Sequence, residues 1–147
     1  MCCCSQVWAW TGYVLQVEDG NTIKVSKQPQ GQGEQVLVRL YGIDAPVLSQ
    51  PYAREAQYFL HKLLPRDAMI NVEETGEEKD GSLTALVQVD GSSVNYQLIV
   101  DGLAWVNRTT CKALFCRRWY IQEHRALKQG KGLWGLKLAT PPWQWSR

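Results

Sequence analysis

The stretch Val38-Arg39-Leu40-Tyr41-Gly42-Ile43-Asp44-Ala45-Pro46 joins an alternating segment to a loop, and the fold prediction starts from it. Apolar residues alternate through positions 36–41, as in a strand with one buried face. Arg39 lies on that strand, and Asp44 follows just past its end. The two side chains can project into one pocket, where a guanidinium binds phosphate and a carboxylate binds a hard cation. On spacing alone, an ordinary surface ion pair is the commoner explanation.

Patterns on both sides of this stretch predict four further strands and three helices. A hairpin is expected from residues 11–17 and 22–25, around the turn Asp19-Gly20-Asn21. The other predicted strands are 36–41, 69–72 and 83–89, with an acidic, turn-rich connection over 73–81. Apolar residues at helical spacing predict helices over 53–64, 94–100 and 115–129. These elements predict an α+β, mainly β fold: a five-stranded OB-fold barrel with three helices.

The composition is that of one folded domain. A chain of 147 residues has the length of a single domain. Its 45% apolar and 20% charged residues exclude a disordered chain. No apolar stretch approaches the roughly 20 residues of a membrane-spanning helix. We therefore expect a globular monomer without a membrane span.

The net charge of +2 hides an uneven distribution. Residues 1–80 carry 7 Lys/Arg against 11 Asp/Glu, whereas residues 81–147 carry 9 against 3. In the predicted last helix, basic residues group on the face opposite Phe115, Trp119 and Ala126. The residues predicted to bind nucleic-acid phosphates are Arg117, Arg118, Arg125, Lys128 and the preceding Arg108. A solvated helix face explains the same pattern, so this alternative stays open.

The five cysteines, three of them adjacent at positions 2–4, lack the even count of a disulfide framework. They also lack the paired spacing of a zinc site. No apolar leader segment follows the first residues, so the sequence as it stands favours the cytoplasm. A secreted or lipid-anchored protein is expected instead if the native start lies upstream.

Further motifs follow one another in a fixed order. They are Val17-Glu18-Asp19-Gly20-Asn21-Thr22-Ile23-Lys24-Val25, the stretch 38–46, Gln50-Pro51-Tyr52-Ala53-Arg54-Glu55-Ala56, Val89-Asp90-Gly91 with Val94-Asn95, Asp101-Gly102-Leu103-Ala104-Trp105-Val106, Gly132-Leu133-Trp134 and Pro141-Pro142-Trp143-Gln144-Trp145. In this order they resemble the staphylococcal-nuclease-like, or thermonuclease, domain family, and the last is similar to the tail of bacterial members. The resemblance implies an N-terminal tail over 1–10, the OB-fold domain over 11–138 and a Pro/Trp tail over 139–147.

The resemblance also implies a catalytic cleft for phosphodiester hydrolysis. In active members Ca²⁺ is held by two aspartates and a backbone carbonyl, which correspond here to Asn21, Asp44 and Ala45. Asp19 is expected just behind these ligands. Arg39 matches one of two arginines that stabilise the transition state. The general-base glutamate falls on Val47, and the second arginine falls on Ser82.

The three departures, at Asn21, Val47 and Ser82, imply weak or absent Ca²⁺ binding and little or no hydrolysis. We therefore expect a domain that binds nucleic acid, with single-stranded DNA or RNA as its partner. Whether the chain is an enzyme stays open. Two alternatives remain: an active metal-dependent endonuclease, and a protein-interaction module in which the barrel binds a protein partner.

Overall fold

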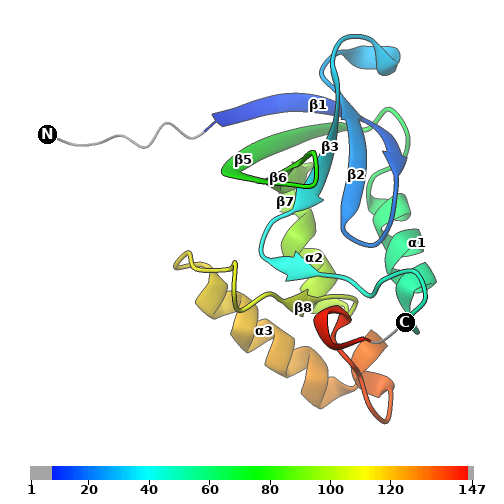
Figure 1. The fold of residues 1–147 in the computed structure, drawn as a ribbon, viewed down its shortest axis with the longest axis vertical. Helices are drawn as coiled ribbons and strands as arrows, with labels where there is room; N and C mark the ends of the chain where they lie inside the picture. Colours follow the sequence, from blue (N-terminus) through cyan, green and yellow to red (C-terminus); the bar gives the residue numbers. More distant parts are fainter. Residues whose placement is uncertain (1–7, 146–147) are drawn as a thin grey trace, which may run out of the picture.

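The computed structural model describes residues 8–145, and the side chains of these residues except 77–79. Five long strands close into a barrel (Figure 1). They are β1 (Trp8–Val17), β2 (Thr22–Ser26), β3 (Gln35–Leu40), β5 (Met69–Lys79) and β6 (Ser82–Val89). Antiparallel neighbours run in the order β3-β2-β1-β5-β6, and a parallel pairing of β3 with β6 closes the barrel. The predicted mainly β fold, an OB-type barrel with three helices, is confirmed.

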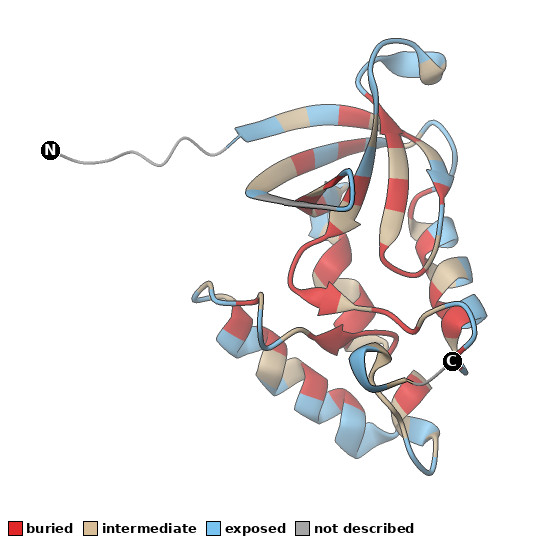
Figure 2. Ribbon diagram, in the orientation of Figure 1, coloured by how far each residue is buried: buried red, intermediate tan, exposed pale blue. Residues whose placement is uncertain are grey.

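The barrel closes around an apolar interior because alternate residues of each strand point inward. On β2 and β3 these residues are Ile23, Val25, Val38 and Leu40, each at most 1% exposed. Burying each such side chain stabilises the fold by about 1.5–3 kcal/mol. A slip of one residue in strand pairing would turn all of them to solvent, so their burial fixes the register. Figure 2 shows buried residues along the barrel interior and where the helices meet it.

Three helices cover one end of the barrel: α1 (Ala53–Leu63), α2 (Val94–Val100) and α3 (Cys116–Gln129). The Ser93 hydroxyl accepts a hydrogen bond from the Tyr96 N–H at 3.1 Å and so caps the start of α2. Gly130, with a φ of +64°, ends α3 in the left-handed conformation that glycine adopts at little cost. In Figure 1, α2 lies between the barrel and α3. No helix among residues 8–145 has the length and apolar character needed to cross a bilayer.

Short elements connect the barrel to the helices. They are β4 (Ile43–Asp44), β7 (Ser92–Ser93), β8 (Trp105–Val106) and the 3₁₀ turns η1 (Pro29–Gly31), η2 (Gly132–Gly135) and η3 (Pro142–Gln144). β4 pairs antiparallel with β8, with Asp44 opposite Trp105. This small sheet places Asp44 beside the loop that follows β8.

Two strand predictions are wrong in extent. β1 begins at Trp8, three residues earlier than expected, because its first half pairs with β5. The connection predicted over 73–81 is mostly strand, because β5 continues to Lys79 and the chain reverses at Asp80-Gly81. Both turn residues have positive φ, at 52° and 79°, as in the tight hairpin turns that favour Asp-Gly. The second half of β5 was predicted as a connection because its residues are acidic.

The C-terminal segment folds back onto the loop that follows β4. The Gln50 side chain donates to the Thr140 carbonyl at 2.7 Å, and Trp145 Nε1 donates to Ser49 Oγ at 3.0 Å. Trp143 packs edge-on against the buried Trp105. The domain boundaries at 10 and 138 stay predictions.

A disulfide joins Cys111 to Cys116 at the start of α3, with a Cα–Cα distance of 5.8 Å. Both cysteines are 2% exposed. The number of cysteines does not predict this bond, because an odd total can still include one disulfide between two cysteines that are close in the sequence. The three cysteines at positions 2–4 lie outside the described residues.

Candidate functional site

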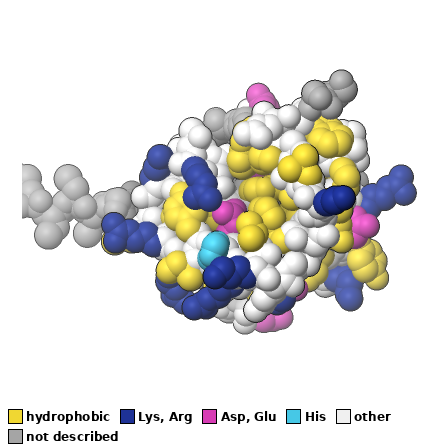
Figure 3. Space-filling view, turned by 90° about the horizontal axis from the view of Figure 1, so that it is seen from below, with side chains coloured by type: hydrophobic (Ala, Val, Ile, Leu, Met, Phe, Trp, Pro, Cys, Tyr) yellow, Lys and Arg dark blue, Asp and Glu magenta, His cyan; other side chains and the backbone are white. Residues whose placement is uncertain are grey.

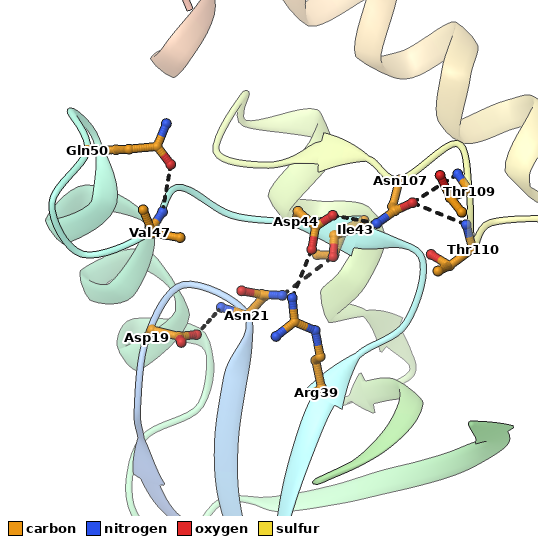
Figure 4. A network of polar contacts seen from close by, with 10 residues as sticks. All are labelled: Asp19, Asn21, Arg39, Ile43, Asp44, Val47, Gln50, Asn107, Thr109 and Thr110. Carbon is orange, nitrogen blue, oxygen red and sulfur yellow. Dashed lines mark hydrogen bonds and ion pairs between the residues drawn. The ribbon is translucent and has the colours of Figure 1, made fainter. Parts of the chain in front are cut away.

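The site predicted from Arg39 and Asp44 is a real ion pair (Figure 4). Val38 and Leu40 point into the barrel, so Arg39 between them points outward. Asp44 lies on β4, where the chain has turned back across the end of β3. Arg39 Nη2 donates to Asp44 Oδ1 at 2.9 Å, with the side chains 31% and 13% exposed. The two residues therefore form a partly buried ion pair, and their part in a binding pocket stays a prediction.

Asn107, which the sequence analysis missed, completes the environment of Asp44. Its Nδ2 donates to Asp44 Oδ2 at 2.6 Å. Its Oδ1 accepts from the backbone N–H groups of Thr109 and Thr110 at 2.9 and 3.1 Å, which fixes the amide orientation. Its own N–H donates to the Gly42 carbonyl at 2.8 Å. Both carboxylate oxygens of Asp44 are thus engaged by protein donors. No spacing rule could find Asn107, because the β4–β8 pairing alone brings it to Asp44.

The turn after β1 brings Asn21 into the same site. Asp19 Oδ1 accepts from the Asn21 N–H at 2.9 Å, so this carboxylate stabilises the turn. Asn21 is 5% exposed, and its Nδ2 faces the Ile43 carbonyl at 3.4 Å. The backbone carbonyl of Asn21 accepts from the Leu40 N–H at 2.9 Å, which links the turn to the end of β3. Three of the residues predicted for the site, Arg39, Asp44 and Asn21, therefore lie close together. Asn21 provides an amide at the position where the family pattern has a carboxylate.

The residues gathered here do not fit a calcium ion. Calcium sites use six to eight oxygen ligands, and their affinity rises with the number of charged ligands. Asp44 supplies one carboxylate, and both of its oxygens already accept hydrogen bonds from Arg39 and Asn107. The Asn21 amide turns its nitrogen toward the site, and Ala45 is 4% exposed. Among residues 8–145, no three His, Cys, Asp or Glu side chains gather as a metal-binding group.

Position 47, where the family pattern has its general base, carries an apolar side chain. Val47 is half-buried in the loop after β4. Its N–H donates to Gln50 Oε1 at 2.8 Å, and the other end of that amide holds the C-terminal segment at Thr140. Gln50 is 7% exposed, and both the oxygen and the nitrogen of its side-chain amide form hydrogen bonds. The loop is therefore built around a structural glutamine, and Val47 offers no proton acceptor.

Position 82, where the family pattern has its second arginine, lies on the same side of the barrel wall as Arg39. The parallel register places Arg39 opposite Thr84, and Ser82 precedes Thr84 by two residues. Residues two apart on a strand point to the same face. Ser82 is 8% exposed at the start of β6. Ser82 therefore lies on the same face as Arg39, where serine provides no positive charge.

The predicted cations of α3 do not join this pocket. Trp119, Glu123 and Ala126 pack inward, and the exposed side chains of α3 point away from the barrel. The exposed cations are Arg117, Arg118, Arg125 and Lys128. Figure 3 shows Lys and Arg side chains grouped over the α3 side of this face. Among residues 8–145, no hydrogen bond or ion pair links these four side chains to Arg39 or Asp44.

Arg108, the fifth predicted cation, is partly committed to the fold. Its guanidinium pairs with Glu123 at 3.2 Å and lies over the Tyr120 ring at 4.9 Å. Glu123 Oε2 also accepts from the Val106 N–H at 2.6 Å. Burial raises the pKa of Glu123 above its usual 4.5, and the Val106 hydrogen bond and the Arg108 charge oppose this shift. Arg108 therefore serves a buried carboxylate, which limits its part in binding phosphate.

Together, the fold and the site define a barrel domain of nuclease type whose cleft holds an Arg–Asp pair. Residues 37–135 match the family described as staphylococcal nuclease homologue. The chain is 31% identical over 137 residues to an uncharacterized endonuclease of Escherichia coli, covering 91% of this chain and 83% of that protein. The chain belongs to the staphylococcal nuclease homologue family.

Plant proteins show the same similarity. A probable staphylococcal-like nuclease of Oryza sativa subsp. japonica is 32% identical over 124 residues, and a staphylococcal-like nuclease of Arabidopsis thaliana is 29% identical over 121 residues. These alignments cover 81% and 79% of this chain but only 36% of either plant protein. The chain thus spans about a third of the length of these plant relatives.

Proposed function

We propose that this chain is a thermonuclease-type domain that binds nucleic acid and hydrolyses phosphodiester bonds slowly or not at all. The observation that carries the proposal is the state of Asp44, whose two carboxylate oxygens are held by Arg39 and Asn107. Each oxygen keeps a second lone pair, but the charge of this carboxylate is offset by the neighbouring arginine, and calcium affinity depends on the number of charged ligands.

The substitutions at positions 47 and 82 support the same proposal. A positioned general base contributes roughly 10²–10⁴ to a rate. An electrostatic donor at the transition state contributes roughly 10²–10³. Val47 and Ser82 supply neither group. Because such groups act as a unit, their losses do not simply multiply, but little hydrolysis of the family type should remain.

Binding is supported by the exposed cations of α3. Arg117, Arg118, Arg125 and Lys128 lie within about three turns of one helix and point to solvent. Cations that contact phosphates release counterions from the strand, which favours association at low salt. We infer that single-stranded DNA or RNA binds along this surface without strong sequence preference.

One paired assay tests the proposal. Fluorescent single-stranded DNA and RNA are incubated with the protein in Ca²⁺, Mg²⁺, Mn²⁺ or chelator, and cleavage and binding anisotropy are both measured. We expect salt-dependent binding in every condition and no metal-dependent cleavage above the buffer control. Metal-dependent cleavage at rates typical of enzymes would refute the loss of hydrolysis. No binding at about 50 mM salt, where counterion release favours it, would refute the binding surface.

Two other functions rest on specific observations. The relatives are named as nucleases, and Glu18, Asp19 and Glu55 lie near the missing groups in sequence, so an active endonuclease using another carboxylate is the second candidate. The third is a protein-interaction module. Ile121 and Leu127 on α3 are 55% and 48% exposed, and Leu114 just before this helix is 82% exposed, which suits a protein surface better than a phosphate backbone.

The disulfide bears on location. Buried disulfides persist in oxidising compartments and are rare in the cytosol. The Cys111–Cys116 bond therefore supports folding of this domain in an oxidising compartment, against the cytoplasm that was expected from the sequence as it stands. Mass spectrometry of the protein alkylated without reduction, after extraction from its native cells, tests this by counting the protected cysteines.

A further inference from the structure

A second cavity lies at the end of the barrel where β1 begins. The first half of β1 pairs only with β5, because pairing with β2 starts at Tyr13. In Figure 1, β1 and β5 extend beyond β2 at this end. The cavity beside them has a volume of about 730 Å³, within the range of roughly 300–1,000 Å³ that is usual for ligand sites. Neither Arg39 nor Asp44 is among the residues that line it.

Two tryptophans supply the aromatic part of this cavity. Trp8 and Trp10 are two residues apart on β1, so their side chains stand on one face about 7 Å apart at their bases. Gly12 is next on that face, and a Cβ there would come within 2.8 Å of the Trp10 ring. The Trp10 ring therefore leans over Gly12, on the side away from Trp8. The absence of a side chain at Gly12 thus leaves space between the two indoles.

The two rings differ in how they are held. Trp10 Nε1 donates to Glu74 Oε2 at 2.9 Å, and Lys27 Nζ lies 5.0 Å from the centre of the Trp10 ring. Trp8 is 68% exposed and makes no ring contact with another described residue. The Trp10 indole is therefore held in place, whereas the exposed Trp8 indole is free to pack against a ligand.

The polar groups of the cavity restrict the ligand class. The bases of the two side chains are about 7 Å apart, twice the roughly 3.4 Å spacing of stacked bases, which leaves room for one flat ring beside the exposed Trp8 indole. The carboxylate of Glu74 can accept from the exocyclic amine of a base. Lys27 also lines the cavity, and although its ammonium pairs with the exposed Glu34 at 3.3 Å, it provides a cation near the attached phosphate.

We propose that this cavity binds one unstacked base of a single strand between Trp8 and Trp10. The inference rests on the proposed function, because it adds a contact with a base to a domain whose α3 cations contact phosphates. Aromatic stacking of this kind is tolerant of sequence and adds affinity that rising salt does not remove.

The test compares two strands of equal charge. One is fluorescein-labelled oligo(dC) of about 16 nucleotides, the upper end of OB-fold site sizes, and the other is a fully abasic strand of that length. Their affinities are measured by anisotropy at pH 7.5 for the wild type, Trp8→Ala, Trp8→Tyr and Trp143→Ala. Trp143 is the matched control, because it is 54% exposed but lies on the C-terminal segment, away from this cavity.

We expect Trp8→Ala to weaken binding of oligo(dC) roughly tenfold and to leave the abasic strand unchanged. Trp8→Tyr should restore most of the affinity, and Trp143→Ala should behave as the wild type. Because Trp8 is exposed, the circular dichroism spectrum and melting temperature should not change. These results together would establish an aromatic contact with a base.

Three outcomes would overturn the base site, and they separate it from the proposed function. Equal wild-type binding of both strands, unaffected by Trp8→Ala, would leave phosphate binding standing and remove the base contact. Binding of neither strand would remove both. A Trp8-dependent response to a proline-rich peptide, with none to either strand, would assign the cavity to a protein ligand instead.

Discussion

The Arg39–Asp44 pocket and the outer face of α3 were both predicted from charged residues, yet the structure uses their charges in opposite ways. In the pocket, the guanidinium and the carboxylate neutralise each other, and Asn107 holds the remaining oxygen. On α3, Arg117, Arg118, Arg125 and Lys128 point to solvent, and the carboxylate of that helix, Glu123, is buried. The two charges of the Arg39–Asp44 pair offset each other, whereas the helix face can still attract a polyanion.

This contrast separates chemistry from binding. A catalytic cleft needs groups left unsatisfied by the protein, so that substrate or metal can satisfy them. A binding surface needs only a favourable field and exposed contacts. Restoring charged groups in the pocket and neutralising the helix face should therefore reverse the contrast.

The largest effect is expected from restoring the pocket with Asn21→Asp, Val47→Glu and Ser82→Arg together. The variant regains a charged ligand, a base and a second guanidinium, so Ca²⁺-dependent cleavage should rise at least about 10³-fold. Each single change should gain little, because the groups act as a unit. Cleavage of a fluorogenic single strand with Ca²⁺ or chelator measures the gain.

The control for this variant is the same triple change with Arg39→Ala, which should cleave no faster than the wild type. In the wild type, calorimetry should find Ca²⁺ binding no tighter than about millimolar. Wild-type cleavage near the rate of the triple variant would show that other carboxylates already perform the chemistry. A well-folded triple variant that binds Ca²⁺ without cleaving would show that the pocket no longer places a phosphodiester beside Arg39.

The second effect is expected from Arg117→Gln, Arg118→Gln, Arg125→Gln and Lys128→Gln combined. Losing four phosphate contacts should lower the slope of log affinity against log salt by about 3 for single strands. Changes of the exposed Arg54, Lys62, Arg66 and Lys137 to Gln remove the same charge from elsewhere and form the control. Equal losses in both variants would mean that net charge, rather than the α3 face, attracts the strand.

The sequence predicts those parts of the molecule that depend on local pattern. The helix over 94–100 is confirmed at both ends, because Ser93 caps it and Gly102 follows it. Arg39, Asp44 and Asn21 meet as expected, since one strand end and one turn place them. The continuation of β5 was missed because partner strands, rather than its acidic residues, stabilise it. Asn107 was missed because it is 63 residues from Asp44 and reaches it only through β4–β8 pairing.

The third effect concerns the disulfide beside the loop that carries Asn107. Cys111→Ala with Cys116→Ala removes a short closed loop, which should cost about 2 kcal/mol of unfolding free energy. For a domain of this size the melting temperature should fall by several degrees. Thermal denaturation with and without reductant measures it. The reductant should lower the wild type to the level of the variant and leave the variant unchanged; an unaffected wild type would contradict the bond's contribution.

The smallest effect is expected from Glu123→Gln on the buried side of α3, and it concerns pH. Burial raises the pKa of Glu123 above 4.5, so between that value and the raised one the folded state binds more protons than the unfolded state. Stability must therefore fall as the pH rises through this window.

The variant Glu123→Gln removes the ionisable group. The glutamine oxygen can still accept from the Val106 N–H. The lost ion pair with the exposed Arg108 is worth under about 1 kcal/mol. Melting temperatures from pH 4 to pH 8 should thus show the wild type losing stability relative to Glu123→Gln as the pH rises. The exposed Glu55→Gln on α1 should run parallel to the wild type. A wild type that instead gains stability relative to Glu123→Gln on raising the pH would mean that the Arg108 charge outweighs burial, and that an ion pair holds α3 to the loop after β8.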